Sequence, residues 1–171
     1  MRLTKEEYYM LMAQMASLRS TCLSRRVGAV LVSDDAVVAT GYNGPARGVE
    51  HCEDAGGCKR RAMPDYESGK YLEICPAAHA EANAIAMAAR RGIKVDGATA
   101  YVNTYPCKDC MNLLINAGIK KVVYNNSYNA DLSSELATMA RIEVVKYRGR
   151  DIEEISSSKE IEKPKVKKLK K

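Results

Sequence analysis

Two short segments of the 171-residue sequence hold side chains that can bind a metal ion and move protons. The first runs from His79 to Glu81, and the second runs from Pro106 to Cys110. Cys107 and Cys110 are three positions apart, so on a helix their sulfur atoms share one face and can hold one ion. Zinc binds cysteine sulfur and histidine nitrogen in a tetrahedron, and a catalytic zinc has three protein ligands and a fourth position for water. We therefore expect His79, Cys107 and Cys110 to be the ligands of a catalytic zinc.

Glu81, two residues from His79, is placed to carry protons beside such a zinc. The metal lowers the pKa of a bound water molecule towards about 7, and a nearby carboxylate can transfer protons. Hydrolytic deamination needs this shuttle, because a proton leaves the water, the ring nitrogen is protonated and the departing ammonia receives another proton. His-x-Glu followed by Pro-Cys-x-x-Cys is the zinc deaminase pattern, in which the glutamate is not a ligand. Either motif alone also fits a structural zinc knuckle or a redox pair, but together they favour a deaminase with Glu81 as proton shuttle.

Both motifs stand at the start of a predicted helix. Apolar residues repeat at helical spacing from about His79 to Gly92, and again from about Pro106 to Gly118. Proline suits the entry of a helix, and glycine its end. The partial positive charge of a helix N-terminus favours thiolate over thiol, so these positions suit metal-binding cysteines.

The other predicted elements alternate along the chain. A capping box and short apolar runs predict a helix over 5–20, strands over 27–32, 36–40, 98–103, 121–125 and 142–147, and a helix over 131–140. The resulting order, α-β-β-α-β-α-β-α-β, indicates an α/β protein. Its last three strands can be parallel neighbours joined by crossover helices.

The other cysteines are also candidate metal ligands. A chain expected in the cytoplasm keeps its thiols reduced, so metal binding is favoured over a disulfide framework. Six cysteines and two histidines make eight ligands, enough for two four-coordinate sites or for one site with spares. Residues 45–78 show little periodicity and hold four of the eight, so we interpret this segment as a Cys-rich insertion in need of a stabilising contact.

The positive charge of the protein is concentrated at the C-terminal end. Residues 159–171 contain seven lysines and two glutamates, which leaves a net charge of about +1 for the rest. We therefore expect one zinc-dependent deaminase domain over 1–155 and a disordered Lys-rich tail over 156–171. A nucleic-acid partner is not expected, because the domain lacks a basic surplus. The charged N-terminus and the absence of a long apolar stretch predict a cytoplasmic protein without a membrane segment.

Five segments match motifs of a known family: residues 22–30, 41–44, 79–85, 105–110 and 117–124. They resemble the cytidine deaminase superfamily, and within it the bacterial and phage-type branch of the deoxycytidylate (dCMP) deaminases. The resemblance implies a three-layer α/β/α fold with a five-stranded mixed sheet. It also implies hydrolysis of dCMP to dUMP and ammonia, which supplies dUMP for dTTP synthesis.

The resemblance also implies residues that contact the substrate. It assigns zinc binding and proton transfer to the four residues already named. Asn43 occupies the position that contacts the sugar or base, and Tyr128 is similar to the aromatic residue that closes over the base. No motif identifies the phosphate-binding residues, but Arg25, Arg26 and Lys108 are candidates because a phosphate dianion prefers arginine or lysine.

Regulation and assembly follow from the same resemblance. Many members form homohexamers that dCTP activates and dTTP inhibits, with Mg²⁺ accompanying the triphosphate. The loop from Gly41 to Gly44, together with Asn83 and Arg90, lies where this regulation is usually placed.

A second, structural zinc is present in some members of the bacterial and phage branch. Cys22 and Cys75 match positions expected to serve it, and His51, Cys52 and Cys58 compete for the other two. The set that we predict is Cys22, His51, Cys58 and Cys75.

Two other functions remain open at this point. The same zinc core would serve a deaminase of another cytosine or adenine nucleotide or base, such as dCTP or tRNA adenosine, although tRNA needs a basic binding surface. A non-enzymatic alternative is a zinc-stabilised nucleic-acid-binding module in which the Lys-rich tail contacts the phosphates.

Overall fold

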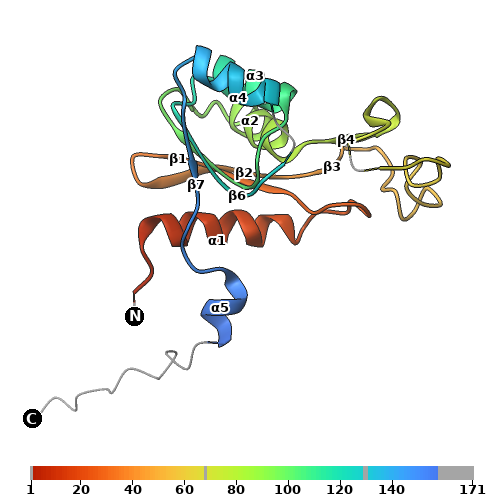
Figure 1. Cartoon of the computed structure of the whole chain (residues 1–171), viewed down its shortest axis with the longest axis horizontal. Coiled ribbons are helices and arrows are strands. Elements are labelled where there is room, and N and C mark those ends of the chain that lie inside the picture. The colour runs from red at the N-terminus through yellow and green to blue at the C-terminus, as the bar shows by residue number, and fades with distance from the viewer. Residues whose placement is uncertain (1, 68, 129–130, 158–171) are drawn as a thin grey trace, which may run out of the picture.

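A five-stranded sheet forms the middle layer of the protein, and helices cover both of its faces (Figure 1). The structure, a computed structural model, describes residues 2–67, 69–128 and 131–157. Its helices are α1 (Lys5–Ser17), α2 (Ala80–Arg90), α3 (Lys108–Asn116), α4 (Asp131–Met139) and α5 (Ile152–Ser157), with the short 3-10 helix η1 (Leu72–Ile74). Its strands are β1 (Gly28–Ser33), β2 (Ala36–Tyr42), β3 (Gly44–Pro45), β4 (Ala77–Ala78), β5 (Thr99–Thr104), β6 (Lys121–Asn126) and β7 (Glu143–Lys146).

The strand order β2-β1-β5-β6-β7 makes the central sheet mixed. β1 pairs antiparallel with both β2 and β5, whereas β5, β6 and β7 are parallel. Parallel neighbours need a crossover connection, and α3 and α4 supply the two crossovers on the face that also carries α2 (Figure 1). The three-layer fold with a five-stranded mixed sheet is therefore confirmed.

The alternation of side chains along β1 divides the core between the two faces of the sheet. Ala29 and Leu31 point into the larger cluster, which includes the small residues of α2. Val30 and Val32 point to the other face, where they pack in a cluster with Met10 of α1. A strand buried on both faces has almost no polar positions, and this explains why β1 is a continuous apolar run.

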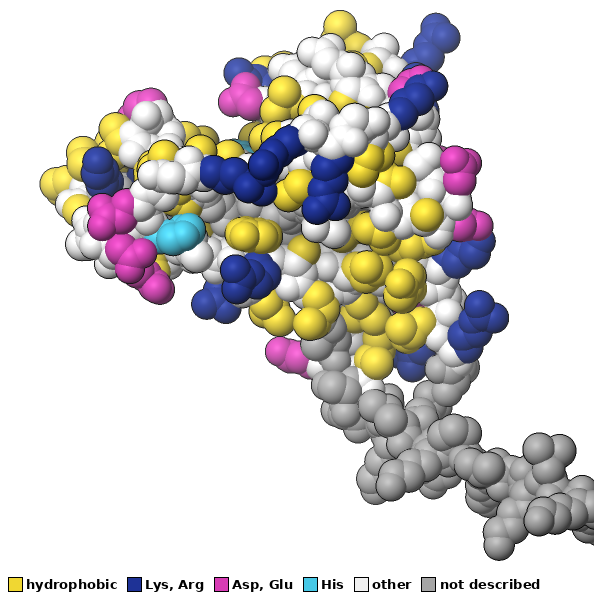
Figure 2. Space-filling model, turned by 180° about the vertical axis from the view of Figure 1, so that it is seen from behind, with side chains coloured by type: hydrophobic (Ala, Val, Ile, Leu, Met, Phe, Trp, Pro, Cys, Tyr) yellow, Lys and Arg dark blue, Asp and Glu magenta, His cyan; other side chains and the backbone are white. Residues whose placement is uncertain are grey.

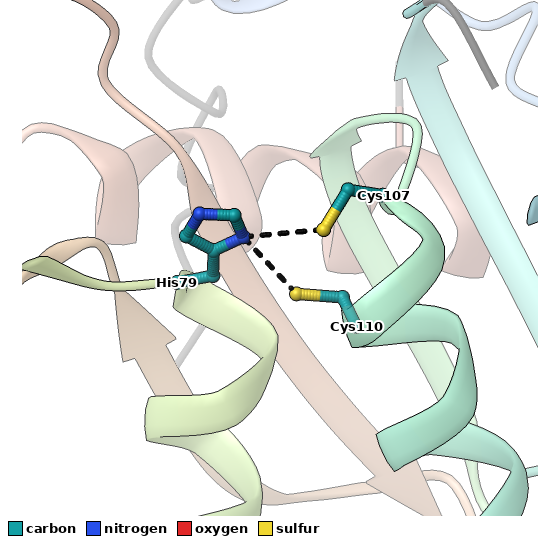
Figure 3. Close-up of side chains that lie close together, drawn as sticks. All are labelled: His79, Cys107 and Cys110. Carbon is teal, nitrogen blue, oxygen red and sulfur yellow. Dashed lines mark hydrogen bonds between the residues drawn. The ribbon is translucent and has the colours of Figure 1, made fainter. Parts of the chain in front are cut away.

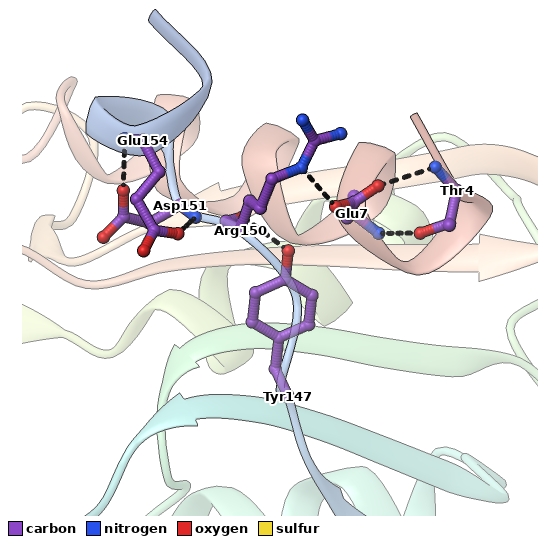
Figure 4. A network of polar contacts seen from close by, with 6 residues as sticks. All are labelled: Thr4, Glu7, Tyr147, Arg150, Asp151 and Glu154. Atoms are coloured by element: carbon purple, nitrogen blue, oxygen red, sulfur yellow. Dashed lines mark hydrogen bonds and ion pairs between the residues drawn. The ribbon is translucent and has the colours of Figure 1, made fainter. Parts of the chain in front are cut away.

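Helix α1 begins with the predicted capping box. The backbone N–H of Glu7 donates to the Thr4 hydroxyl at 3.2 Å, and the backbone N–H of Thr4 donates to the Glu7 carboxylate at 2.8 Å. Arg150, close to the C-terminal end of the described chain, donates from Nε to the same carboxylate at 3.0 Å (Figure 4). The Arg150 hydrogen bond and the Thr4 N–H together lower the pKa of Glu7 to about 2. This network ties the two ends of the fold together.

Two glycines allow helices to approach the sheet closely. A Cβ atom at Gly41 in β2 would lie 2.2 Å from the carbonyl oxygen of Ala80 in α2. A Cβ atom at Gly28 in β1 would lie 2.1 Å from the carbonyl oxygen of Ala13 in α1. The absence of a side chain at these two positions sets the distance of each helix from the sheet.

The insertion expected over 45–78 projects from one end of the sheet (Figure 1). Its base is closed by the small β3–β4 ladder, in which Gly44 pairs with Ala78 and Pro45 with Ala77. Apart from η1, the described residues between these strands form turns and loops. The ladder places the start of the insertion beside the chain that enters α2.

The ends of the chain differ in detail from the predicted elements. α1 stops at Ser17, and the residues after it make turn-type bonds such as Leu18 N–H to the carbonyl of Met15. α5 runs to Ser157, past residue 155, while residues 158–171 of the predicted tail lie outside the described residues. Within the described part of the chain, no helix has the length and apolar character needed to span a membrane.

Candidate active site

His79, Cys107 and Cys110 come together between the first turns of α2 and α3 (Figure 3). His79 is the N-cap of α2, and Cys107 is the N-cap of α3. The His79 Nδ1 atom lies 3.3 Å from the sulfur of Cys107 and 3.3 Å from that of Cys110. The sequence predicted this placement from two helix starts, and parallel strand β5 leads directly to the second of them.

The geometry of this cluster suits a zinc ion. Bond lengths of about 2.3 Å to sulfur and about 2.0–2.1 Å to nitrogen in a tetrahedron separate the two ligand atoms by about 3.5 Å. The observed separations of 3.3 Å are close to that value. Neither N-cap residue uses its side chain to cap its helix, so both remain available to a metal. The positive ends of two helices also favour thiolate ligands.

Glu81 lies in the first turn of α2 with only 4% of its surface exposed. Its carboxylate contacts the thiol of Cys110. Among the described residues, the compact group of possible ligand atoms, all within 4.8 Å of one another, contains His79, Cys107 and Cys110 but not Glu81. Glu81 therefore stands beside the cluster rather than in it, as a proton shuttle requires.

Hydrogen bonds and burial shift the pKa values of all four groups. A hydrogen bond from the Cys110 thiol lowers the pKa of Cys107 to about 4, and the bond to His79 lowers it further against the effect of burial. The same Cys107–Cys110 bond, together with burial, raises the pKa of Cys110. The Cys107 bond raises the pKa of His79, and burial raises that of Glu81. These contacts favour the thiolate form of Cys107 next to His79.

A cavity of about 290 Å³ opens beside the cluster, with His79, Glu81 and Cys107 in its wall. This volume is at the lower end of the range for small-molecule sites, which is roughly 300–1,000 Å³. Two of its other wall residues are the cations Arg25 and Arg60. Two possible metal ligands, a buried carboxylate and two cations therefore line one space of small-molecule size.

Both predicted substrate-contact residues line this cavity. The side-chain amide of Asn43 is already used within the protein: its Oδ1 accepts from Ser20 Oγ at 2.6 Å and from Val27 N–H at 2.8 Å, and its Nδ2 donates to the Arg25 carbonyl at 2.8 Å. Asn43 therefore shapes the loop that forms one wall. The guanidinium of Arg25 lies over the ring of Tyr128, 5.1 Å from the ring centroid. This pair forms another side of the cavity.

The candidate phosphate-binding and regulatory residues lie in different places. Of the three phosphate candidates only Arg25 lines the cavity, while Arg26 is exposed and Lys108 pairs with Asp109 at 3.0 Å. Asn83 Nδ2 donates to the Tyr42 carbonyl at 2.8 Å, which fastens the loop after β2 to α2. The remaining candidates are Gly41, packed against α2, Gly44, paired in β3, and Arg90, exposed in the last turn of α2.

The four cysteines outside the catalytic cluster lie near one another. Burial raises the pKa of Cys52, and the neighbouring sulfurs of Cys58, Cys75 and Cys22 raise it further. Cys22 and Cys58 both contact Ser24: its backbone N–H lies 3.4 Å from the first sulfur, and its hydroxyl 3.9 Å from the second. In the described part of the chain, however, only the catalytic cluster brings three ligand atoms within 4.8 Å of one another.

His51, which we predicted to join the second metal site, has another contact. Its Nδ1 lies 2.9 Å from the hydroxyl of Thr21, and its side chain is exposed. Cys52 thus interacts electrostatically with the other three cysteines, while His51 is exposed and contacts Thr21. Sequence spacing alone did not separate these two adjacent residues.

Arg60 and Tyr66 of the insertion are cavity residues that the sequence analysis did not single out. Arg60 is 8% exposed, and its guanidinium lies 5.6 Å from the centroid of the Tyr66 ring. Neither residue belongs to a motif, and both stand in a segment without periodicity. The chain path through the insertion, not a local signal, brings them to the site.

Comparisons with known proteins agree with the site geometry. Residues 3–126 match the family described as the cytidine and deoxycytidylate deaminase zinc-binding region. The deoxycytidylate deaminase of Mycobacterium phage D29 is 43% identical over 125 residues, covering 70% of this chain and 92% of the phage protein. The deoxycytidylate deaminase of Schizosaccharomyces pombe is 44% identical over 126 residues, covering 74% of this chain and 38% of the yeast protein.

The fold has a relative among solved structures. The dCMP deaminase of cyanophage S-TIM5, in complex with dCMP and dUMP, matches 86% of this chain and 99% of its own with a TM-score of 0.71 and 28% identity. The chain spans only about two fifths of the length of the yeast deoxycytidylate deaminases that it matches. The family match covers most of the sequence and includes all four residues of the cluster, and on this basis the chain belongs to the cytidine and deoxycytidylate deaminase zinc-binding family.

Proposed function

We propose that this protein is a zinc-dependent hydrolase that converts dCMP to dUMP and ammonia. The observation that carries the proposal is the three-ligand cluster of His79, Cys107 and Cys110, with buried Glu81 beside it, at the wall of a cavity of about 290 Å³. The names of the relatives support dCMP as substrate, because the phage D29 protein and the S-TIM5 structure are both dCMP deaminases.

In the proposed mechanism His79, Cys107 and Cys110 hold the zinc. The ion, when bound, supplies the Lewis acidity that brings the pKa of a water molecule near neutrality. Three protein ligands would leave a fourth position of a tetrahedral zinc for water, and the lowered pKa of Cys107 favours its thiolate as a ligand.

Glu81 moves the protons. Its carboxylate accepts a proton from the attacking water and donates it to the ring nitrogen N3 of cytosine, while a bond forms between the water oxygen and C4. A second proton then passes through the same carboxylate to the exocyclic amino group, and the C4–N4 bond breaks to release ammonia. Burial keeps Glu81 away from bulk water, so each proton is exchanged only with the substrate and the attacking water.

The cavity favours a small nucleotide over a polymer. Its volume suits a small ligand, and two arginines in its wall complement a phosphate charge. For dCTP the same site would need to hold a triphosphate, and tRNA would need a broad basic surface. A nucleic-acid-binding module would have no use for a buried carboxylate beside a three-ligand zinc site.

A substrate panel tests the proposal. The zinc-loaded protein is incubated with dCMP, dCTP, deoxycytidine, cytosine and an adenosine-containing tRNA loop, and released ammonia and products are measured. We expect dUMP from dCMP as the preferred reaction. If dCMP yields no dUMP while another substrate is deaminated, the substrate assignment is wrong, and if none reacts the enzymatic proposal fails.

We also propose a second zinc in the insertion, held by Cys22, Cys52, Cys58 and Cys75. The mutual proximity of these thiols supports this set, and the contact of His51 with Thr21 favours Cys52 over His51 for the fourth position. Elemental analysis should give two zinc ions per chain. A value of one would exclude the second site.

Finally, we propose that dCTP, bound with Mg²⁺, activates a homohexamer and that dTTP inhibits it. This part of the proposal rests on the family resemblance, together with the attachment of the loop after β2 to α2 through Asn83. A titration of dCMP deamination with each triphosphate, combined with sedimentation analysis of mass, tests regulation and assembly separately.

A further inference from the structure

Arg60 is a buried cation that has no acidic partner among the described residues. Only 8% of its surface is exposed. Its Nε donates to the backbone carbonyl of Lys70 at 2.7 Å, and its guanidinium lies over the ring of Tyr66, 5.6 Å from the centroid. Across the described residues, no carboxylate oxygen lies within 4.0 Å of its nitrogens. Burial of a charged group costs free energy unless the charge is paired. Arg60 therefore has the properties of a residue that binds an anionic ligand.

Two acidic residues that follow Arg60 in the insertion, Asp65 and Glu67, have other partners. Lys70 pairs with Asp65 at 3.8 Å and with Glu67 at 3.2 Å, and Asp65 also accepts the hydroxyl of Tyr71. Asp65 and Glu67 therefore have partners other than Arg60. The same loop provides only a neutral carbonyl and an aromatic ring to Arg60 itself.

Arg60 lines the same cavity as His79 and Cys107. Arg60 and Glu81 both line that cavity, and Glu81 is the only carboxylate among its described wall residues. Lys and Arg side chains also extend across the junction between the projecting loop and the body of the protein (Figure 2). Two arginines in the wall of one cavity attract a ligand of negative charge.

We propose that Arg60 binds the phosphate group of a nucleoside monophosphate whose base is held at Glu81. This inference rests on the proposed function and adds the residue that makes the site select a nucleotide over a nucleoside. With Nε fixed by the Lys70 carbonyl, the two terminal nitrogens are left to form a bidentate pair with phosphate oxygens. The Tyr66 ring and the Lys70 carbonyl hold the Arg60 guanidinium in place before the phosphate binds. This reduces the conformational entropy lost on binding.

In an alternative role, the positive charge of Arg60 would offset the negative charge of the cysteine ligands at the proposed second zinc. Arg60 is two residues from Cys58 and interacts electrostatically with its sulfur. If this were its function, loss of the guanidinium would release the second zinc and would weaken all ligands of the cavity alike. The experiment must therefore report zinc content and compare ligands that differ only in the phosphate.

Binding is measured by calorimetry in the zinc-loaded Glu81→Gln protein, so that substrate is not consumed. Dissociation constants for dCMP and deoxycytidine are compared with and without Arg60→Gln. We expect Arg60→Gln to weaken dCMP binding by about 10- to 100-fold, the range for loss of a charged hydrogen bond, and to leave deoxycytidine binding and two zinc ions per chain unchanged. Arg47→Gln removes an exposed positive charge from the same loop and should alter neither ligand.

The outcomes separate the two proposals. Three results would overturn the assignment of Arg60. They are equal dCMP binding with and without Arg60→Gln, equal weakening of dCMP and deoxycytidine binding, and loss of zinc in Arg60→Gln. If Arg60→Gln does not fold, inorganic phosphate is titrated against dCMP in the Glu81→Gln protein, and failure to compete overturns it as well. If Arg60-dependent dCMP binding is found but the wild-type protein releases no ammonia, the proposed reaction fails and the Arg60 inference stands.

Discussion

The two groups of cysteines in this protein are held in different ways. Cys107 and Cys110 stand in the first turn of α3, against His79 at the start of α2. Cys52, Cys58 and Cys75 lie in the insertion, whose described residues form mostly turns. The possible ligand atoms of the helix-borne group lie within 4.8 Å of one another, while no such compact group is found among the described residues of the insertion.

We expect the supporting element to decide how far each proposed metal site is formed before the metal binds. Helix N-termini fix ligand positions through backbone geometry and packing against the sheet. Zinc at this site should therefore be needed for the reaction more than for the fold. In a loop, the ligand side chains lose conformational entropy when the metal binds, and this loss opposes binding. We therefore expect metal loss to change activity at the first site and loop structure at the second.

The largest effect is expected from Cys107→Ser. Loss of one of three ligands should remove the catalytic zinc and lower dCMP deamination by about 10³-fold or more, because several kcal/mol of charge stabilisation disappear. The fold should persist, since the sheet and its clusters do not depend on this side chain. Elemental analysis should find one zinc fewer per chain, and an ammonia assay gives the rate. Full activity with the zinc absent would refute the role of this ligand.

The next largest effect is expected from Gly41→Ala, which disturbs the helix that carries His79 and Glu81. The added methyl group would meet the Ala80 carbonyl at 2.2 Å, and such overpacking costs about 1–3 kcal/mol of unfolding free energy. Displacement of α2 should also lower kcat/KM for dCMP by about tenfold or more.

Gly28→Ala is the matched control for this change. Its Cβ would meet the Ala13 carbonyl at 2.1 Å, so it should destabilise the protein to a similar extent. It acts on α1, across the sheet from the zinc cluster, and the folded protein should keep its kcat/KM. Equal losses of activity in both variants would show that α2 is not specifically responsible. Urea unfolding and initial rates at a temperature where both are folded make the comparison.

A smaller effect on activity is expected from Cys58→Ser. Loss of the loop zinc should raise the rate of trypsin cleavage within the insertion by about tenfold or more, because local opening becomes easier. Deamination should fall less than in Cys107→Ser, since the catalytic ligands remain. His51→Ala should change neither zinc content nor cleavage. A loss of zinc in His51→Ala would restore His51 to the ligand set.

The smallest effect is expected from Glu7→Gln, remote from both metal sites. The pKa of Glu7 is lowered to about 2 from an ordinary value of 4.5, so its contribution to stability is present above pH 4.5 and is lost as the pH falls towards 2. At pH 7 the variant should therefore unfold a few degrees below the wild type, and this difference should vanish near pH 2. A difference in thermal midpoint that stayed constant with pH would rule out the ionised carboxylate as its source.

Local signals made the catalytic cluster predictable from the sequence. Pro106, Gly92 and Gly118 mark helix boundaries, and β5 leads into α3 at the position that parallel topology requires. The predicted strands and helices of the sheet region are confirmed, with shifts of at most three residues at their ends. The β3–β4 ladder was missed because each strand has two residues, too few to show alternation.

The wall of the cavity was less predictable. Arg60 carries no pattern that separates it from exposed cations such as Arg61, because its burial depends on contacts with Lys70 and Tyr66. The choice between His51 and Cys52 also depends on the path of the loop. Neighbouring residues point in different directions there, and only tertiary contacts decide which one faces the other cysteines.

The most direct test of the central claim is the effect of Glu81→Gln on the zinc-loaded protein. The account places Glu81 beside the three ligands as the group that moves protons, so the amide should bind dCMP and keep all zinc. It should release ammonia roughly 10²- to 10⁴-fold more slowly than wild type. A rate close to wild type, or loss of the catalytic zinc together with activity, would contradict the assignment of Glu81 as a proton shuttle that does not bind the metal.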